Sequence, residues 1–344
     1  MPRLLLKLAL LVVALVIAIA ILRASLPYGW GNPYVVHKLE QLSERDIKPR
    51  QLIIGSSRAY RSVIPDLLDS LMGAPTGTTY NLAGPGISAG QCFYLADHVL
   101  ADTALSGGLR TLVFELQDHA PITGNLGTNV RETYWHGVRH WWMTCAAVIQ
   151  SNRKWTTKTI LLRDHSLALL RASLGLGLYS GVRELFMPSR TRQELIGARN
   201  DGFRDLEDES GSSDEREVHS GLRERHQEWF ANTALRSKVM NNARSSRTDT
   251  LARPGSADVD RLHDLIERCE ARGIRFIAWL PPLSNSAYAH ALFRTVPVDH
   301  RVDLHDPYRF PELYTIEHAF DRGHLDRSGA ELLTRYLAQE LIDP

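Results

Sequence analysis

The sequence has little cysteine and no excess of either charge. Its three cysteines, Cys92, Cys145 and Cys269, form no CxxC pair among the 344 residues. This excludes a zinc ribbon or a thioredoxin-like motif, and so sparse and odd a set forms no disulfide framework. We therefore expect buried free thiols. Lys and Arg number 40 and Asp and Glu 39, for a formal net charge of +1. The basic footprint that nucleic-acid binding needs is missing, so no nucleic-acid partner is expected.

One long apolar run is present, at the N-terminus. It extends over Leu4–Leu22, interrupted by Lys7, and Arg3 and Lys7 precede its uncharged part. Basic residues before an apolar run keep the N-terminus in the cytosol and direct the chain after the run to the other side of the membrane. The uncharged part is short for a membrane span, and Ala18–Ala20 is a weak cleavage site, so a cleaved signal peptide stays open. Snorkelling by Lys7 lengthens the run, and we favour an uncleaved anchor over residues 1–25.

Aromatic residues come directly after this apolar run. Tyr28, Trp30 and Tyr34 stand where a membrane interface favours aromatic rings. We therefore expect a single-pass protein of the inner (cytoplasmic) membrane. Residues after about 35 should then lie on the periplasmic or extracellular side.

Short apolar runs bounded by Gly and Pro predict an α/β core. Strands are predicted over Gln51–Gly55, Thr79–Gly86, Thr111–Leu116 and Ile274–Pro282, and helices over 65–72, 89–105, 257–272 and 328–341. The late order of helix, Gly273 and strand is the return half of a βαβ unit, which implies parallel pairing. We expect one α/β domain over residues 45–344.

Residues 120–255 have a different character. They contain several helical patterns, three tryptophans (Trp135, Trp141 and Trp142) and the acidic stretch Asp205–Glu217. The composition of the acidic stretch predicts a solvated or disordered loop. The whole region is predicted to be a mainly helical insertion in the α/β domain.

A possible nucleophile follows the first predicted strand. That strand ends in Gly55, and Ser56 and Ser57 follow where the chain must turn into a helix. A serine at such a turn lies at the carboxyl edge of the sheet, where α/β proteins bind their ligands. Its own N–H, near a helix N-terminus, can face a developing oxyanion. Taken alone, the pattern is equally that of a plain turn.

A possible acid–base pair precedes the last predicted helix. Asp321 and His324 lie three residues apart. The carboxylate can accept from one imidazole nitrogen and leave the other to take a proton from a serine. The alternative is a capping arrangement, in which Asp326 or Ser328 caps the last helix and His324 is incidental.

The order of these segments resembles the SGNH (GDSL) hydrolase superfamily. The resemblance places Ser57 on the nucleophile and Ser56 on the Asp that usually precedes it, after Gly55. Asn81 and Gly86 keep the spacing of the second block, in which the glycine supplies an oxyanion-hole N–H.

The last block of the family, D-x-x-H, matches Asp321 and His324. The third block, G-x-N-D, is missing, because the third strand leads into Gln117, Asp118 and His119. We assign Gln117 as the replacement amide donor of the oxyanion hole. The resemblance covers about residues 50–120 and 256–344, roughly half of the chain.

The chain looks most like a membrane-linked subset of this superfamily, which includes the D-alanine-transfer protein of Gram-positive cell walls and the alginate O-acetylation proteins. The resemblance implies a flavodoxin-like three-layer domain with a parallel central sheet and a Ser-His-Asp triad. It also implies acyl transfer to or from an envelope or extracellular polysaccharide, a membrane-bound O-acyltransferase partner, and no cofactor or metal.

Three other patterns compete with this interpretation. Gly86–Gly90 matches G-x-S-x-G around Ser88, but an interrupted strand precedes it, unlike the elbow of α/β-hydrolases. His136 and His140 are spaced as a metal pair without an HExxH frame, and a packed or membrane-near helix is the simpler interpretation. Arg58 and Arg61 could bind an anionic substrate, but solvation on the surface is the favoured interpretation for both.

These residues support two functions. The first is an acyl-transfer enzyme, either an O-acyltransferase or an esterase. The second is a non-catalytic glycan-binding or scaffold protein of a polysaccharide export or modification complex. The enzyme predicts that Ser57 Oγ lies within about 5 Å of a ring nitrogen of His324. Asp321 should then contact the other ring nitrogen, the Gly86 N–H should face the same space, and the insertion should form a wall or lid nearby.

Overall fold

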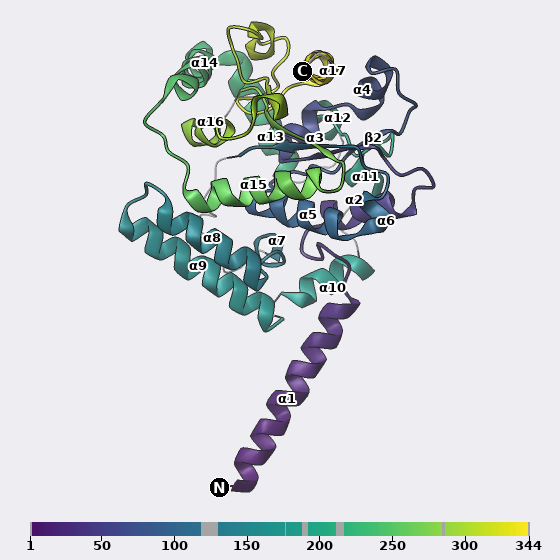
Figure 1. Cartoon of the computed structure of the whole chain (residues 1–344), viewed down its shortest axis with the longest axis vertical. Coiled ribbons are helices and arrows are strands. Elements are labelled where there is room, and N and C mark those ends of the chain that lie inside the picture. Colours follow the sequence, from purple (N-terminus) through teal and green to yellow (C-terminus); the bar gives the residue numbers. More distant parts are fainter. Residues whose placement is uncertain are drawn as a thin grey trace. The chain divides into compact units, whose positions relative to one another are not determined.

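The computed structural model describes residues 2–117, 130–175, 177–187, 192–210, 217–283 and 286–342. Asp118 and His119, and part of the acidic stretch, therefore lie outside the described residues. The chain forms two compact units (Figure 1). The first unit comprises Met1–Leu39 and Pro121–Thr191, and the second comprises Glu40–Ala120 and Arg192–Pro344.

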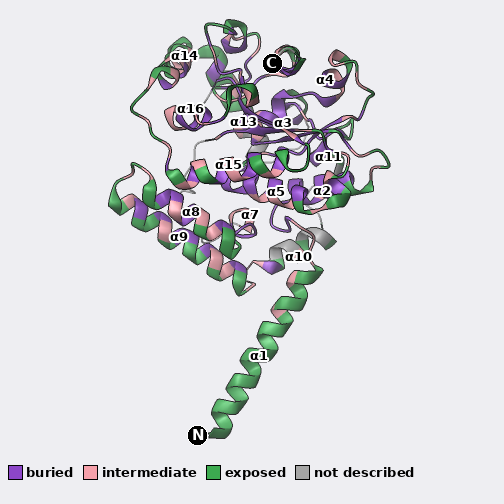
Figure 2. Ribbon diagram, viewed as in Figure 1, coloured by how far each residue is buried: buried purple, intermediate pink, exposed green. Residues whose placement is uncertain are grey.

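The first unit begins with the apolar helix α1, Pro2–Ser25. Its 24 residues are long and apolar enough to cross a membrane, and none of them is buried against the protein (Figure 2). At 1.5 Å per residue α1 is about 36 Å long, against a hydrocarbon core of about 30 Å. The predicted anchor segment is thus a continuous exposed helix.

Two of the three aromatic residues predicted to lie at the membrane interface are buried in the protein. Trp30 and Tyr34 are buried, with 9% and 6% of their surfaces exposed, and the guanidinium of Arg131 lies 5.5 Å from the Tyr34 ring centre. The expectation that these two rings face the membrane interface is therefore wrong, because they pack inside the first unit.

The remaining described part of the first unit is helical. It consists of α7 (Val130–Thr133), α8 (Val138–Gln150), α9 (Trp155–Ser173) and α10 (Leu178–Phe186). Helices α8 and α9 pack against each other. Inside this unit His136 Nε2 lies 2.9 Å from His165 Nδ1.

The second unit is built on a parallel sheet of five strands. They are β1 (Gln51–Ile54), β2 (Thr79–Asn81), β3 (Thr111–Glu115), β4 (Arg275–Leu280) and β5 (Arg301–Asp303). Their order is β2-β1-β3-β4-β5, and each neighbouring pair runs parallel. The predicted α/β class and parallel pairing are confirmed.

Helices cover both faces of this sheet. Figure 1 shows α5 (Ala89–Ala101) and α15 (Ser256–Glu270) on one side, and α4 (Pro65–Leu71) and α17 (Arg327–Ile342) on the other. The helix predicted over 89–105 is broken, because the Asp102 side chain accepts from the Ala104 N–H at 2.8 Å and starts α6 (Thr103–Ser106).

Smaller elements complete the description. They are α2 (Pro33–Glu44), α3 (Ser57–Ser62), α11 (Arg192–Ile196), α12 (Leu206–Ser210), α13 (Glu217–Ala231), α14 (Thr233–Thr248), α16 (Ala287–Phe293) and the 3₁₀ turns η1 (Val298–His300) and η2 (Pro311–Tyr314). All three cysteines are buried free thiols, as expected.

The region predicted as a single helical insertion is helical in its described parts and divides between the two units. Its second part is integral to the sheet unit: Phe203 packs on Ile64 and Ala330, and Leu206 packs with Leu222 and Phe320. Burying a ring such as that of Phe203 contributes about 2–3 kcal/mol.

The acidic stretch begins inside this packed region. Leu206–Ser210 forms α12, and Asp205 and Glu209 are buried. Asp205 pairs with Arg327 at 3.1 Å, and Glu209 pairs with Arg61. The prediction of a solvated or disordered loop is therefore wrong for residues 205–210, where arginines neutralise the carboxylates.

Candidate active site

The site lies at the carboxyl edge of the sheet, where β1 separates β2 on one side from β3 on the other. Such a reversal of strand order leaves a crevice outside the strand ends, in which α/β proteins bind ligands. Ser57 follows β1 and is the first residue of α3, and Ser56 is the N-cap of that helix. The turn of chain after β1 therefore presents Ser57 at this crevice.

Gly55 is required at this turn by close packing. A Cβ at this position would lie 2.4 Å from Glu115 Oε2 and 2.6 Å from the Ala59 Cβ. Any side chain would displace either the carboxylate or α3. Gly55 is thus needed to admit a carboxylate of the neighbouring strand.

Glu115, the last residue of β3, was not singled out from the sequence. It is buried, with 1% of its surface exposed. Its carboxylate accepts from the Ser56 N–H at 2.6 Å and from the Ser56 hydroxyl at 2.9 Å. It also pairs with Arg58 at 2.7 Å. Glu115 thus fixes the residues on both sides of Ser57 and ties the nucleophile turn to the neighbouring strand.

The two arginines near Ser57 are not solvated surface groups. The Arg58 side chain is 15% exposed and is bound to Glu115, and the Arg61 side chain is 5% exposed and is paired with Glu209. Water-facing arginines were the favoured interpretation from the sequence, and the structure corrects it. The Arg58 guanidinium neutralises a buried carboxylate, and a role of Arg58 in substrate binding stays a prediction.

The three residues predicted as a triad are hydrogen-bonded in series. His324 Nε2 lies 2.9 Å from Ser57 Oγ, and His324 Nδ1 lies 2.9 Å from Asp321 Oδ1. Ser57 and His324 are 267 positions apart in the chain, so no local rule brings them together. The predicted approach within about 5 Å is confirmed. In this order the serine can lose its proton to the imidazole while the carboxylate holds the opposite ring nitrogen.

The turn around Asp321 orients the imidazole. Asp321 Oδ1 also accepts from the N–H groups of Gly323 at 2.8 Å and His324 at 2.9 Å. Burial alone would raise the pKa of Asp321, but the hydrogen bond and charge of His324, the Gly323 N–H and Arg225 hold that pKa at about 2. The carboxylate is therefore charged at neutral pH and favours the imidazole tautomer with a proton on Nδ1.

Helix α13 forms a wall beside this turn. Arg225 Nε lies 3.8 Å from Asp321 Oδ2, and His226 Nδ1 lies 2.9 Å from the Phe320 carbonyl oxygen. The His226 ring also stacks on the Phe320 ring with centroids 4.4 Å apart. The second part of the predicted insertion thus stands next to the triad, in the place predicted for a wall.

The loop after β2 supplies the second predicted block. The Asn81 amide donates to the carbonyls of Ala59 and Val63, at 2.9 and 3.0 Å, so Asn81 joins β2 to α3. The Gly84 N–H donates to the Gly55 carbonyl at 3.2 Å, which holds this loop against the nucleophile turn.

Gly86, in the same loop, has a positive φ of 70°. Within the described residues neither its N–H nor that of Ser57 is engaged in a hydrogen bond. The assignment of the Ser57 and Gly86 N–H groups to an oxyanion hole stays a prediction.

The Gln117 amide, predicted as the third donor, contacts a cysteine of α5, and its role in an oxyanion hole stays a prediction. Its Nε2 lies 3.2 Å from Cys92 Sγ, and the residue lines a small pocket with Phe93, Asp258 and Tyr288. The amide is thus held against α5. The role predicted for Gln117 in an oxyanion hole therefore requires a rotation of its side chain.

The competing patterns have other roles in the structure. Ser88 is the N-cap of α5, and its N–H donates to Gln91 Oε1 at 2.9 Å. His136 pairs with His165, not with His140. Among the residues that the structure describes, no three His, Cys, Asp or Glu side chains are grouped as a metal would require.

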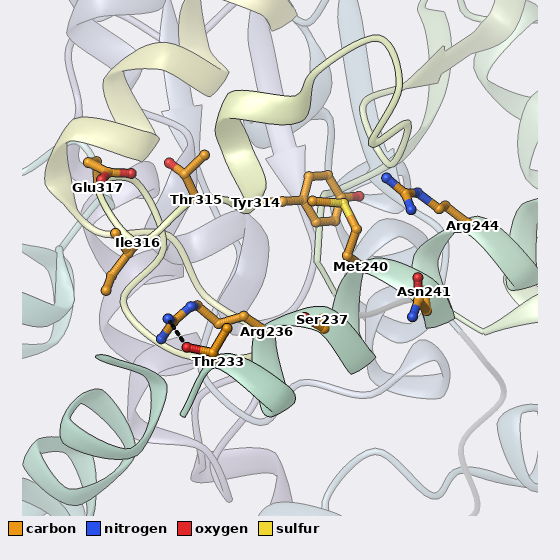
Figure 3. A pocket seen from close by; sticks show the side chains of 10 residues that line it. All are labelled: Thr233, Arg236, Ser237, Met240, Asn241, Arg244, Tyr314, Thr315, Ile316 and Glu317. Carbon is orange, nitrogen blue, oxygen red and sulfur yellow. Dashed lines mark hydrogen bonds between the residues drawn. The ribbon is translucent and has the colours of Figure 1, made fainter. Parts of the chain in front are cut away.

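A cavity of about 460 Å³ lies between helix α14 and residues 314–317 (Figure 3). Helix α14 forms one wall with Arg236 and Arg244, and Tyr314 and Glu317 form the other. The Tyr314 hydroxyl and Arg244 Nε are buried without a hydrogen-bond partner among the described residues.

No protein-family model matches this chain, and neither a curated protein nor a solved structure matches it.

Proposed function

We propose that this chain is a serine acyl-transfer enzyme, either an O-acyltransferase or an esterase. The observation that carries the proposal is the continuous series Ser57–His324–Asp321, with both contacts at 2.9 Å. Geometry of this kind, rather than position in the sequence, is the signature of a Ser-His-Asp triad. The location of Ser57 outside the strand ends, at the reversal of strand order, supports the proposal.

In the proposed reaction Ser57 Oγ attacks the carbonyl carbon of an acyl ester while His324 Nε2 takes the hydroxyl proton. Asp321 stabilises the imidazolium that forms. The N–H groups of Ser57 and Gly86 receive the oxyanion. Collapse of the tetrahedral intermediate breaks the ester bond, and His324 returns the proton to the leaving oxygen. A water molecule or a sugar hydroxyl then attacks the acyl-serine by the same steps in reverse.

We further propose that the sheet unit is a flavodoxin-like SGNH domain. The strand order β2-β1-β3-β4-β5 supports this assignment, because it is the order of flavodoxin-like folds. The substrate class, an envelope or extracellular polysaccharide, and the membrane-bound O-acyltransferase partner rest on the resemblance in the sequence. The apolar helix α1 supports attachment to the inner membrane. Arg3 and Lys7 favour a periplasmic or extracellular location for the catalytic residues.

One observation favours a second candidate function. Gln117 Nε2 lies 3.2 Å from Cys92 Sγ, so the amide proposed as the third oxyanion donor is engaged with another residue. Loss of one such donor costs about 10²–10³-fold in rate in serine hydrolases. A chain with the triad but a weak oxyanion hole fits a glycan-binding or scaffold protein of a polysaccharide modification complex.

The two candidates differ in a direct assay. The purified full-length chain in detergent should hydrolyse p-nitrophenyl acetate, and His324→Ala should abolish the turnover. Ser88→Ala is the matched control and should retain it. Added polysaccharide that becomes acetylated, at the expense of hydrolysis, would identify a transferase. A chain that binds the polysaccharide but shows no turnover above the His324→Ala variant would establish the second candidate.

A further inference from the structure

The helical first unit exposes more apolar surface than a water-soluble unit normally does. Isolated exposed apolar side chains are ordinary, but a contiguous set indicates a protein or membrane contact. The exposed large apolar residues of α8, α9, α10 and the residues that adjoin them are Val138, Trp142, Ile149, Trp155, Ile160, Leu167, Leu170, Leu174, Tyr179, Phe186 and Met187. This set requires a partner of matching character.

Four of these residues form one stripe along α9. Ile160, Leu167, Leu170 and Leu174 are separated by seven, three and four positions, which places them on the same face of a helix. The opposite face carries the buried residues of α9 that pack against α8. Arg163, whose side chain is 65% exposed, lies on the same face between Ile160 and Leu167, so the stripe is apolar from Leu167 to Leu174 and carries one cation near its start.

The stripe ends beside the apolar helix α1. A Cβ placed on Gly175 would lie 3.1 Å from a side-chain carbon of Ile19. Ile19 lies three residues before Leu22, where the apolar run ends. At 1.5 Å per residue this is about 4.5 Å inside the end of the run. If α1 crosses a membrane, Gly175 and its neighbours therefore lie at the depth where interfacial helices bury their apolar faces, about 5–10 Å.

The charge of this segment matches a membrane surface. Residues 138–187 contain seven Lys and Arg and two Asp and Glu, so seven minus two gives +5, whereas the whole chain has +1. Basic residues close to a membrane are attracted by anionic headgroups, by about 1 kcal/mol each. Exposed Trp142, Trp155 and Tyr179 add the amphipathic rings that such interfaces favour.

We infer that the exposed stripe of α9, with Tyr179 and Phe186 of α10, binds the surface of the lipid bilayer on the side where α1 ends. The first unit is then bound to the membrane surface next to α1. Its apolar face lies in the headgroup region, and its basic residues contact anionic lipids. This inference rests on α1 crossing the membrane, and it is independent of the triad.

Spin labels in full-length protein test this inference. Single cysteines replace Leu170, Leu174 and Phe186, and Val12 in α1 reports the anchor. The three native cysteines are buried and serve as the unlabelled background. Val298, which is 78% exposed and lies in the other unit, is the matched control. The protein is reconstituted in nanodiscs of phosphatidylcholine and phosphatidylglycerol, and collisions of each label with oxygen and with a water-soluble nickel chelate are compared.

The oxygen-to-nickel ratio should be several-fold higher at positions 170, 174 and 186 than at 298, and highest at position 12. In nanodiscs without the anionic lipid, the ratios at positions 170, 174 and 186 should come closer to the ratio at 298. A high ratio at 12 with ratios at 170, 174 and 186 equal to that at 298 would overturn the inference and leave the face to a protein partner. A low ratio at 12 would overturn both the inference and the anchor, while ester hydrolysis by the same protein would still report on the proposed enzyme.

Discussion

The buried carboxylate of Glu115 gives the most specific prediction about the nucleophile turn. The perturbation is Glu115→Gln, which keeps the shape of the side chain and removes its charge. The amide oxygen of Gln can still accept from the Ser56 N–H. The amide nitrogen, however, would face either the Arg58 guanidinium or the Ser56 hydroxyl, where an acceptor stood before.

The free energy that the nucleophile turn loses depends on how deeply the Glu115–Arg58 ion pair is buried and on the distance between its charged atoms. The ion pair spans 2.7 Å, and its side chains are 0% exposed at Glu115 and 15% exposed at Arg58. Removing one partner of a buried pair costs about 3–5 kcal/mol. The Ser56 N–H bond survives and water reaches part of Arg58, so we expect the lower end, about 3 kcal/mol. At 1.36 kcal/mol per factor of ten, this raises local opening of the turn about 150-fold.

Hydrogen–deuterium exchange on the full-length protein measures this opening. The peptide that contains the Ser56 amide should lose up to about two orders of magnitude in protection, since that amide donates to Glu115. The rate of ester hydrolysis should fall together with this protection, because Ser57 would no longer be held near His324. Glu267→Gln is a substitution of the same type at an exposed position of α15. It should change neither the amide protection nor the rate of ester hydrolysis, because exposed substitutions alter stability by no more than about 0.5 kcal/mol. Equal protection and equal turnover in Glu115→Gln and Glu267→Gln would refute the anchoring role of Glu115.

Three further predictions concern single residues. Ser88→Ala should change the unfolding free energy by less than about 0.5 kcal/mol, because the Ser88 hydroxyl has no hydrogen-bond partner among the described residues, and it should not reduce ester hydrolysis; lost hydrolysis would point to Ser88 as the nucleophile. Asp321→Asn should lower hydrolysis about 10³–10⁴-fold with little change in folding, since it removes the charge that selects the imidazole tautomer; an unchanged rate would exclude the triad. Burial, with Arg247 and Arg294, lowers the pKa of His290 from 6.5 to about 4. The unfolded chain then binds the proton first, so the unfolding free energy should fall by up to about 3 kcal/mol from pH 6.5 to 4, and His290→Asn should flatten that slope in denaturant titrations.

The strand–turn signals and the D-x-x-H spacing predicted the two local parts of the site, the serine turn and the Asp321–His324 turn. Gly55 and the serines after it mark a strand that turns into a helix, and Asp321 and His324 share one turn. These signals are local. The meeting of the two segments could be predicted only from the order of the blocks, since the contact between Ser57 and His324 spans 267 positions.

Glu115 was missed although its signal is in the sequence. It is the one charged residue in the run Thr111–Leu116, which otherwise reads as a buried strand. A buried carboxylate needs a cation and hydrogen-bond donors, and these come from Arg58 and Ser56. An acidic residue at the end of such a strand should therefore be treated as a candidate anchor of the neighbouring turn.

The remaining errors arise because the sequence pattern shows neither contacts between distant residues nor very short strands. Asp205, Glu209 and Arg61 look solvated by composition, but each has a partner far away in the sequence: Arg327 pairs with Asp205, and Glu209 pairs with Arg61. The strand β5 was not predicted, because three residues, Arg301–Asp303, are too short for a periodic pattern. The position of the Gln117 amide depends on Cys92 in another helix, and nothing local to Gln117 indicates that contact.

The central claim is that Ser57 is a nucleophile activated by His324. The most direct measurement is mass spectrometry of the full-length protein after reaction with a fluorophosphonate, which bonds to an activated serine oxygen as fluoride leaves. The account predicts one adduct, on the peptide that contains Ser57, formed in the wild-type chain and the Ser88→Ala variant and absent from Ser57→Ala and His324→Ala. An adduct on Ser88 or on another residue, or none on a folded chain, would contradict it.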